Sequence, residues 1–158
     1  MTLSTSGIVP AIHALREVTD LSLAVSLHAP NDELRSRLMP INRKYPLSRL
    51  VEALHLYRRR TGERITIEYA MIDGVNDAPQ MAYEMAALLD GLEPYINLIP
   101  LNPIPMKPEL RRSPEPKIKA FCAALSELRI EFEVRRERGA DIMAACGQLA
   151  GSLPGPAK

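Results

Sequence analysis

Segments in which every second residue is apolar alternate along the chain with segments in which apolar residues recur every three or four positions. The first pattern predicts strands at residues 2–5, 21–27, 64–71, 95–101 and 131–135. The second pattern predicts helices at residues 8–18, 47–60, 81–89 and 118–128, and a short helix capped by Asn31 or Asp32. Such alternation is typical of consecutive β/α units, whose strands form a parallel sheet with right-handed crossovers.

The first predicted strand begins at the second residue, with no element before it. Five strands also fall short of the eight that close a complete β/α barrel. We therefore expect an α/β fold, an incomplete β/α barrel of parallel strands whose N-terminal strands are missing. Residues 1–151 are expected to form this partial barrel, and residues 152–158 a flexible tail.

The two faces of the predicted strands differ in polarity. One face carries Leu21, Leu23, Val25, Leu27, Ile65, Ile67, Tyr69 and Met71, and the other carries Ser22, Ala24, Ser26, His28, Arg64, Thr66, Glu68 and Ala70. Thr2 and Ser4 share a face of the first strand. The interior of a β/α barrel is normally filled by Val, Ile and Leu, so a polar interior indicates a cavity for a polar cofactor, lined in part by Thr66 and Glu68. The alternative is a solvated sheet face.

Composition restricts the setting and the partners. The 158 residues correspond to one domain, of which 46% are hydrophobic and 25% charged, as in a globular protein. No apolar segment approaches the ~20 residues that span a bilayer, so no membrane partner is expected. A net charge of +1 means that a nucleic acid would have to be bound by local patches, for which the arginines at residues 58–60, 111–112 and 135–138 are candidates. The first of these groups also suits a helix C-terminus.

The two cysteines, Cys122 and Cys146, are too few for a disulfide scaffold and favour a reducing, cytoplasmic setting. Cys146 lies among small residues that would let a planar substrate reach its sulfur, and a thiolate is a strong nucleophile. A buried structural cysteine is the alternative, and from composition alone we favour it for both cysteines. For Cys122 it is further favoured by a position on the apolar face of its helix. Neither cysteine belongs to a closely spaced pair of metal ligands, so no metal site is expected within this chain.

Several long strings of the sequence agree, in order, with one known family. They are LSTSG at residues 3–7, SLHAPND at 26–32, PINRKY at 40–45, NLIPLNP at 97–103, RGADI at 138–142 and AACGQL at 144–149. Over nearly its whole length the chain thereby resembles the C-terminal portion of the radical S-adenosylmethionine methyltransferases that modify carbon 2 of an adenine in 23S ribosomal RNA and in transfer RNA. The partial barrel is then expected to be of the radical S-adenosylmethionine type.

The resemblance implies roles for individual residues. Ser4, Ser26, Leu27, His28 and Asn102 match positions that hold S-adenosylmethionine, and Ser4, Ser26 and His28 also fall on the polar strand faces. Cys146 matches the cysteine that is methylated and then bridges to the base. Adenine carbon 2 is electron-poor and does not attack a methyl sulfonium, which is why the family first methylates a thiolate. A radical formed from a second cofactor molecule then activates that methyl group, and a second cysteine resolves the adduct by forming a disulfide.

The resemblance also implies groups that this chain does not carry. The family holds a 4Fe-4S cluster by a CxxxCxxC loop and needs an external electron donor, and neither this loop nor the resolving cysteine matches any position here. These parts are expected in a missing N-terminal portion of the same enzyme, so the chain alone is expected to be inactive. Two alternatives remain open, namely a non-catalytic RNA-binding remnant and the sister enzyme that methylates carbon 8 of an adenine in ribosomal RNA.

Overall fold

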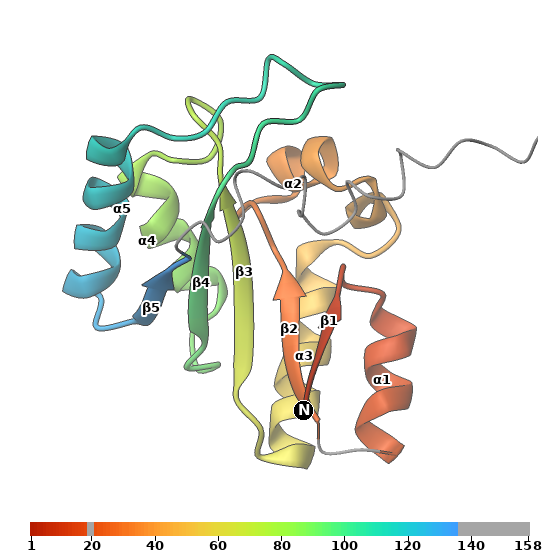
Figure 1. Ribbon diagram of the computed structural model, residues 1–158. Coiled ribbons are helices and arrows are strands. Elements are labelled where there is room, and N and C mark those ends of the chain that lie inside the picture. The colour runs from red at the N-terminus through yellow and green to blue at the C-terminus, as the bar shows by residue number, and fades with distance from the viewer. Residues whose placement is uncertain (19–20, 136–158) are drawn as a thin grey trace, which may run out of the picture.

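A computed structural model describes residues 1–18 and 21–135 of the chain. Within those residues the strands are β1 (Thr2–Thr5), β2 (Ser22–Ser26), β3 (Ile65–Met71), β4 (Tyr95–Pro100) and β5 (Glu131–Val134). The helices are α1 (Val9–Val18), α2 (Asp32–Leu38), the 3-10 helix η1 (Pro40–Arg43), α3 (Leu47–Thr61), α4 (Pro79–Leu88) and α5 (Glu115–Glu127). Strand and helix alternate along the chain as the apolar periodicity predicts (Figure 1).

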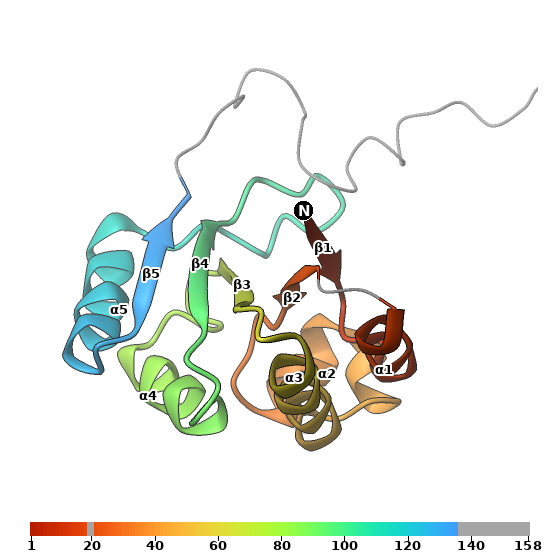
Figure 2. The same cartoon turned by 90° about the horizontal axis from the view of Figure 1, so that it is seen from below.

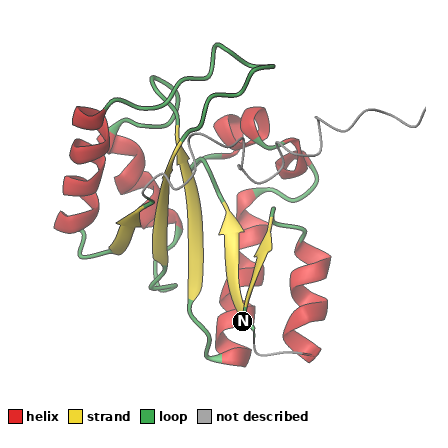
Figure 3. Ribbon diagram, viewed as in Figure 1, coloured by secondary structure: helices red, strands yellow, loops and turns green. Residues whose placement is uncertain are grey.

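The strands form one parallel sheet in the order β1-β2-β3-β4-β5, so each strand pairs with the one that follows it in sequence. All strand arrows run in the same sense (Figure 3). Seen along the strands, the sheet is a curved arc with the helices on its convex side (Figure 2). The expected α/β fold, part of a β/α barrel, is confirmed, and the concave face of the arc corresponds to the interior of a barrel.

The hydrophobic core lies between the convex face of the sheet and the helices. Leu23 and Val25 of β2 and Ile67 of β3 are fully buried there, packed with residues such as Leu54 of α3 and Phe121 of α5. Burying a large aliphatic side chain of this kind contributes about 1.5–3 kcal/mol. The predicted division of the strands into an apolar and a polar face is therefore confirmed, because the apolar set is the one under the helices.

Most boundaries agree with the sequence pattern to within a few residues. Asn31 is the residue that caps α2, where its Oδ1 accepts a hydrogen bond from the amide of Leu34 over 3.0 Å. Helix α3 ends at Gly62, whose φ of 72° is the left-handed cap that glycine adopts freely. The helix η1 was not predicted, since its four residues are too few to show a period. The string AACGQL at residues 144–149 and the expected tail at residues 152–158 lie outside the described residues.

No helix in residues 1–18 and 21–135 has both the length and the apolar character needed to cross a bilayer.

Candidate functional site

The strand register gathers polar side chains on the concave face. Ser26 is the register partner of Glu68, and Glu68 is the partner of Asn97, while Ser4 lies in the same row as Thr66 through Ala24. Residues paired across a parallel sheet point to the same side. These two register rows together, which we call the polar row, face away from the helices on the open side of the arc (Figure 2) and contain Ser4, Ser26, Thr66, Glu68 and Asn97.

Two features of this row fit a polar ligand. The hydroxyl of Ser26 donates to Glu68 Oε2 over a long 3.4 Å, so neither group is committed to a strong internal bond. The Oδ1 atom of Asn97 is buried and has no hydrogen-bond partner among the described residues. An unpaired buried acceptor costs free energy, and a ligand that donates a hydrogen bond removes that cost. Hydroxyl, carboxylate and amide groups together suit the ribose hydroxyls and the amino group of S-adenosylmethionine.

His28 follows β2 with an unusual backbone conformation. Its φ of 60° is left-handed, and its Nδ1 atom accepts a hydrogen bond from the amide of Ala70 over 3.0 Å. Burial, with a smaller contribution from the positive charge of Arg35, lowers the pKa of His28 to about 4. The imidazole is therefore neutral at pH 7. Because Nδ1 is an acceptor, the ring proton sits on Nε2, which is left as a donor.

The conformation of His28 is held by Asn76, a buried residue of the loop after β3. The Nδ2 of Asn76 donates to the carbonyl of His28 over 2.8 Å and to that of Ala70 over 2.6 Å, and its Oδ1 accepts from the amide of Ile72 over 2.8 Å. All of its polar atoms are thus used to join the carboxyl ends of β2 and β3. Sequence reasoning missed Asn76, although a loop of the form DGVND after a strand is a place where side chains cap backbone groups.

Arg35 of α2, whose side chain is fully buried, joins the carboxyl ends of another pair of strands, β1 and β2. Its Nη2 donates to the carbonyls of Ser6 over 2.9 Å and Ser26 over 3.0 Å, and its Nε to the carbonyl of Leu27 over 3.2 Å. One guanidinium therefore holds the carboxyl ends of β1 and β2 together. Burial lowers the pKa of Arg35, and the charge of Asp32 opposes that shift.

The third nitrogen of the Arg35 guanidinium, Nη1, is connected through Asn42 to the carboxylate of Asp32. Nη1 donates to Asn42 Oδ1 over 2.9 Å, and Asn42 Nδ2 donates to Asp32 Oδ1 over 2.8 Å. Asp32 also accepts from the amide of Leu47, which fixes the start of α3. Sequence reasoning missed Arg35 and Asn42, because arginine in a short polar helix is usually solvated.

The other predicted site residues are placed differently. The side chain of Leu27 lies in the core, so a contact of this residue with a cofactor would fall to its backbone. Asn102 is exposed in the loop after β4. Cys146 lies outside the described residues.

The described residues contain no candidate metal site and no disulfide. Cys122 is a half-buried free thiol of α5, and burial raises the pKa of its thiol, which fits a structural role. The disulfide that the resemblance implies therefore has no support. No group of three or more His, Cys, Asp or Glu side chains able to hold a metal ion occurs in residues 1–18 and 21–135.

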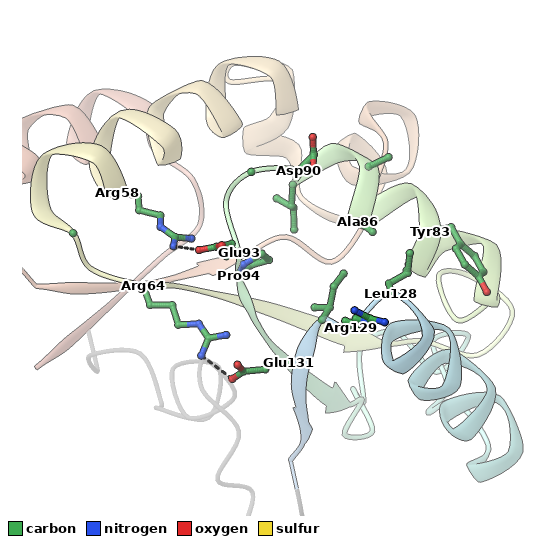
Figure 4. A pocket seen from close by; sticks show the side chains of 15 residues that line it. Arg58, Arg64, Tyr83, Ala86, Asp90, Glu93, Pro94, Leu128, Arg129 and Glu131 are labelled. Atoms are coloured by element: carbon green, nitrogen blue, oxygen red, sulfur yellow. Dashed lines mark hydrogen bonds and ion pairs between the residues drawn. The ribbon is translucent and has the colours of Figure 1, made fainter.

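A cavity of about 900 Å³ lies at the opposite end of the sheet, where β3, β4 and β5 begin (Figure 4). Two of its three arginines are in ion pairs, since Arg58 pairs with Glu93, and Arg64 pairs with Glu131 over 2.8 Å. Ligands of β/α folds bind at the carboxyl ends of the strands, and we therefore place the candidate site on the concave face. No strand or helix of the described residues lies opposite the concave face (Figure 2). The expected cavity lined by Thr66 and Glu68 stays a prediction.

A family model described as the radical SAM superfamily matches residues 1–86. The chain belongs to the radical SAM superfamily. It is 51% identical over 150 residues to a probable dual-specificity RNA methyltransferase RlmN of Desulforudis audaxviator, covering 94% of this chain and 47% of the relative. It is also 51% identical over 155 residues to the dual-specificity RNA methyltransferase RlmN of Marinobacter nauticus, covering 97% of this chain and 42% of the relative. The chain thus spans less than half the length of these relatives.

Two solved structures are also similar to this chain. A radical SAM methyltransferase from Sphaerobacter thermophilus superposes with a TM-score of 0.88 at 51% identity, covering 93% of this chain and 43% of that one. A domain of pyruvate-formate lyase-activating enzyme from Bacteroides vulgatus has a TM-score of 0.65 at 13% identity, covering 85% of this chain and 80% of that one. The second likeness shows a shared fold alone.

Proposed function

We propose that this chain supplies the cofactor-binding face and the methyl-accepting thiol of an RNA methyltransferase that acts on carbon 2 of an adenine in 23S ribosomal RNA and in transfer RNA. The observation that carries the proposal is the polar row on the concave face, in a chain 51% identical to relatives named as dual-specificity RNA methyltransferases. A cytoplasmic setting, with these RNAs and an external electron donor as partners, belongs to the same proposal.

The concave face would bind S-adenosylmethionine, which in this superfamily supplies a methyl group and, with a 4Fe-4S cluster, a radical. Ser26 and Glu68 offer a hydroxyl and a carboxylate for ribose or amino groups, and Ser4 offers a further hydroxyl at the edge of the sheet. The Nε2 proton of His28 is a donor of fixed position, because the ring is neutral and held by Ala70. Asn102 and the backbone of Leu27 complete the proposed contacts.

Cys146 is the proposed methyl acceptor. A thiolate attacks a methyl sulfonium directly, whereas adenine carbon 2 does not, so the sulfur provides the first acceptor. The chain has two cysteines, fewer than the three of a CxxxCxxC loop, so the ligands of the cluster must come from outside it. We therefore expect no turnover by these residues alone.

The proposal is tested by a chimera in which this chain replaces the matching 155 residues of the Marinobacter nauticus relative. The purified, cluster-loaded chimera is incubated with transfer RNA and ribosomal RNA, and the nucleosides are analysed by mass spectrometry. We expect 2-methyladenosine from the chimera and from its Cys122→Ala variant, and none from Cys146→Ala. Formation of 8-methyladenosine would assign the sister activity, and an RNA-binding chimera without any methylation would indicate a non-catalytic remnant.

A further inference from the structure

The loop between β4 and α5 forms an arm over the carboxyl ends of the strands. Figures 1 and 2 show residues 102–111, which we call the arm, reaching across the end of the sheet on the side away from the helices. The arm is fixed at both ends to the last residue of β3 and to the loop that follows. The amide of Leu101, just before the arm, donates to the carbonyl of Met71 over 3.3 Å, and the amide of Asp73 donates to the carbonyl of Arg111 over 2.8 Å. The arm is thus a defined element of the site entrance.

The arm is stiff and carries an apolar side chain at its tip. Two successive turns are closed by the amide of Lys107 to the carbonyl of Ile104 over 2.9 Å and by the amide of Leu110 to the carbonyl of Lys107 over 3.0 Å. Pro103, Pro105 and Pro108 restrict the backbone further. Met106, the third residue of the first turn, is 91% exposed.

Exposed cations without an ion-pair partner among the described residues lie at the carboxyl end of the sheet as well as at its amino end. Of the three arginines of the amino-end cavity, Arg58 and Arg64 are paired with glutamates, whereas no ion pair joins Arg129 to another described residue (Figure 4). At the carboxyl end, Lys107 and Arg111 of the arm are exposed and take no part in the ion pairs of the described residues. The same holds for Arg43 of η1. The helix η1 follows α2 directly in the chain, and Figure 1 shows α2 at this end of the sheet.

We propose that the arm and η1 form the RNA-docking rim of the site, with Lys107, Arg111 and Arg43 against phosphates and Met106 against an unstacked base. The proposal rests on the proposed function, because RNA is the polyanion that would have to present an adenine to the concave face. Cations without carboxylate partners release counterions when they bind phosphates. Proteins that recognise looped RNA stack splayed bases on aromatic side chains or arginine planes. Proteins that kink DNA insert apolar side chains, methionine among them, between bases, and Met106 provides an apolar surface of that second kind.

The test measures binding of fluorescent RNA to the 158-residue chain by anisotropy, at several salt concentrations. The probes are an RNA hairpin with adenines in its loop and a duplex of the same length. We expect the double variant Lys107→Ala/Arg111→Ala to bind the hairpin about tenfold more weakly, with a salt slope smaller by about two. Met106→Ser is expected to weaken binding of the hairpin about threefold or more, and to leave both duplex binding and the salt slope unchanged.

Matched controls lie at the other end of the sheet. Arg59→Ala removes an exposed cation of α3, and Val18→Ser removes an apolar side chain of α1 that is 80% exposed, and neither is expected to change RNA binding. The proposal is overturned if the wild-type chain shows no salt-dependent RNA binding, if the controls lose as much affinity as the rim variants, or if polyglutamate displaces the RNA at equal charge concentration. The last result would assign the rim to an acidic protein.

These outcomes are independent of methylation. Should the chimera methylate RNA while the rim variants bind it normally, the rim proposal fails and the proposed function stands. If instead the chimera does not methylate RNA while the rim variants lose RNA binding, the rim proposal stands and the proposed function fails.

Discussion

Arg35 holds Ser26 by the backbone carbonyl of Ser26 and does not contact the Ser26 hydroxyl. The Nη2 atom of Arg35 donates to the carbonyl of Ser26 over 3.0 Å from the helix side, while the Ser26 hydroxyl points to the concave face and donates to Glu68. The position of the proposed cofactor contact thus depends on a buried cation that the cofactor does not touch.

Replacing Arg35 by lysine should destabilise the fold. Lysine cannot reproduce the forked donors that reach the carbonyls of Ser6 and Ser26 together, and it leaves a buried charge incompletely bonded. We expect Arg35→Lys to lower the free energy of unfolding by about 3 kcal/mol, measured by urea denaturation. Arg37→Lys on the exposed side of α2 is the control, with an expected change within about 0.5 kcal/mol. Equal effects of the two variants would show that the network of Arg35 is dispensable.

Gly7 and Gly62 form a matched pair of left-handed glycines. A Cβ atom at Gly7, where φ is 97°, would lie 3.0 Å from Arg35 Nη2, whereas one at Gly62, where φ is 72°, meets nothing within 4 Å. We expect Gly62→Ala to cost about 1 kcal/mol for the backbone alone, and Gly7→Ala to cost about 2 kcal/mol or more. Thermal or urea denaturation compares the two. A Gly7→Ala variant as stable as Gly62→Ala would mean that the Arg35 side chain moves aside without a loss of stability.

The neutral state of His28 predicts a pH dependence of stability. Its pKa is about 4 in the folded protein against 6.5 in the unfolded chain, so the unfolded chain binds more protons between these values. Stability should therefore be fully present above about pH 6.5 and fall as the pH drops toward 4, with a contribution from His28 on the order of 3 kcal/mol.

The test of this prediction is His28→Asn, because asparagine tolerates a positive φ and offers an acceptor to the amide of Ala70. The variant should lose the His28 part of the slope between pH 4 and 6.5 in urea titrations, whereas His13→Asn on α1 should retain it. An unchanged slope in His28→Asn would contradict the assignment.

From the unpaired Oδ1 atom of Asn97 we predict that removing it raises the stability of the chain and weakens binding of the cofactor. Its Oδ1 is buried without a partner, so Asn97→Val should stabilise the ligand-free chain by about 1 kcal/mol. Calorimetry of the chimera should at the same time show weaker binding of S-adenosylmethionine. The comparison residue is Asn76, where every polar atom is bonded and Asn76→Leu should be strongly destabilising. A destabilised Asn97→Val would show that this oxygen already has a partner.

The repetitive part of the fold could be predicted from the sequence, and so could the polarity of the sheet faces. Alternation in β2 and β3 distinguishes Leu23, Val25 and Ile67, which are buried, from Ser26 and Glu68, which are not. This follows because a strand exposes its side chains to two environments in strict alternation. The short helix η1 is too brief to leave such a signal.

The residues that join the strand ends could not be predicted in the same way. Arg35, Asn42 and Asn76 act through backbone carbonyls of segments distant in sequence, and no local pattern marks a polar residue that finds its partners only after folding. The amino-end cavity was missed for a related reason, since it forms where three helix ends meet. The role of Cys146, which lies outside the described residues, stays a prediction.

The central claim, that the polar concave face is where the cofactor binds, is tested most directly by amide chemical-shift mapping of the 158-residue chain titrated with S-adenosylmethionine. The account predicts that the shifts concentrate at Ser26, Glu68 and Asn97 and disappear in the variant Glu68→Gln. Shifts concentrated instead at Gly62, Gly91 and Glu131, around the amino-end cavity, or no shifts at millimolar cofactor, would contradict it.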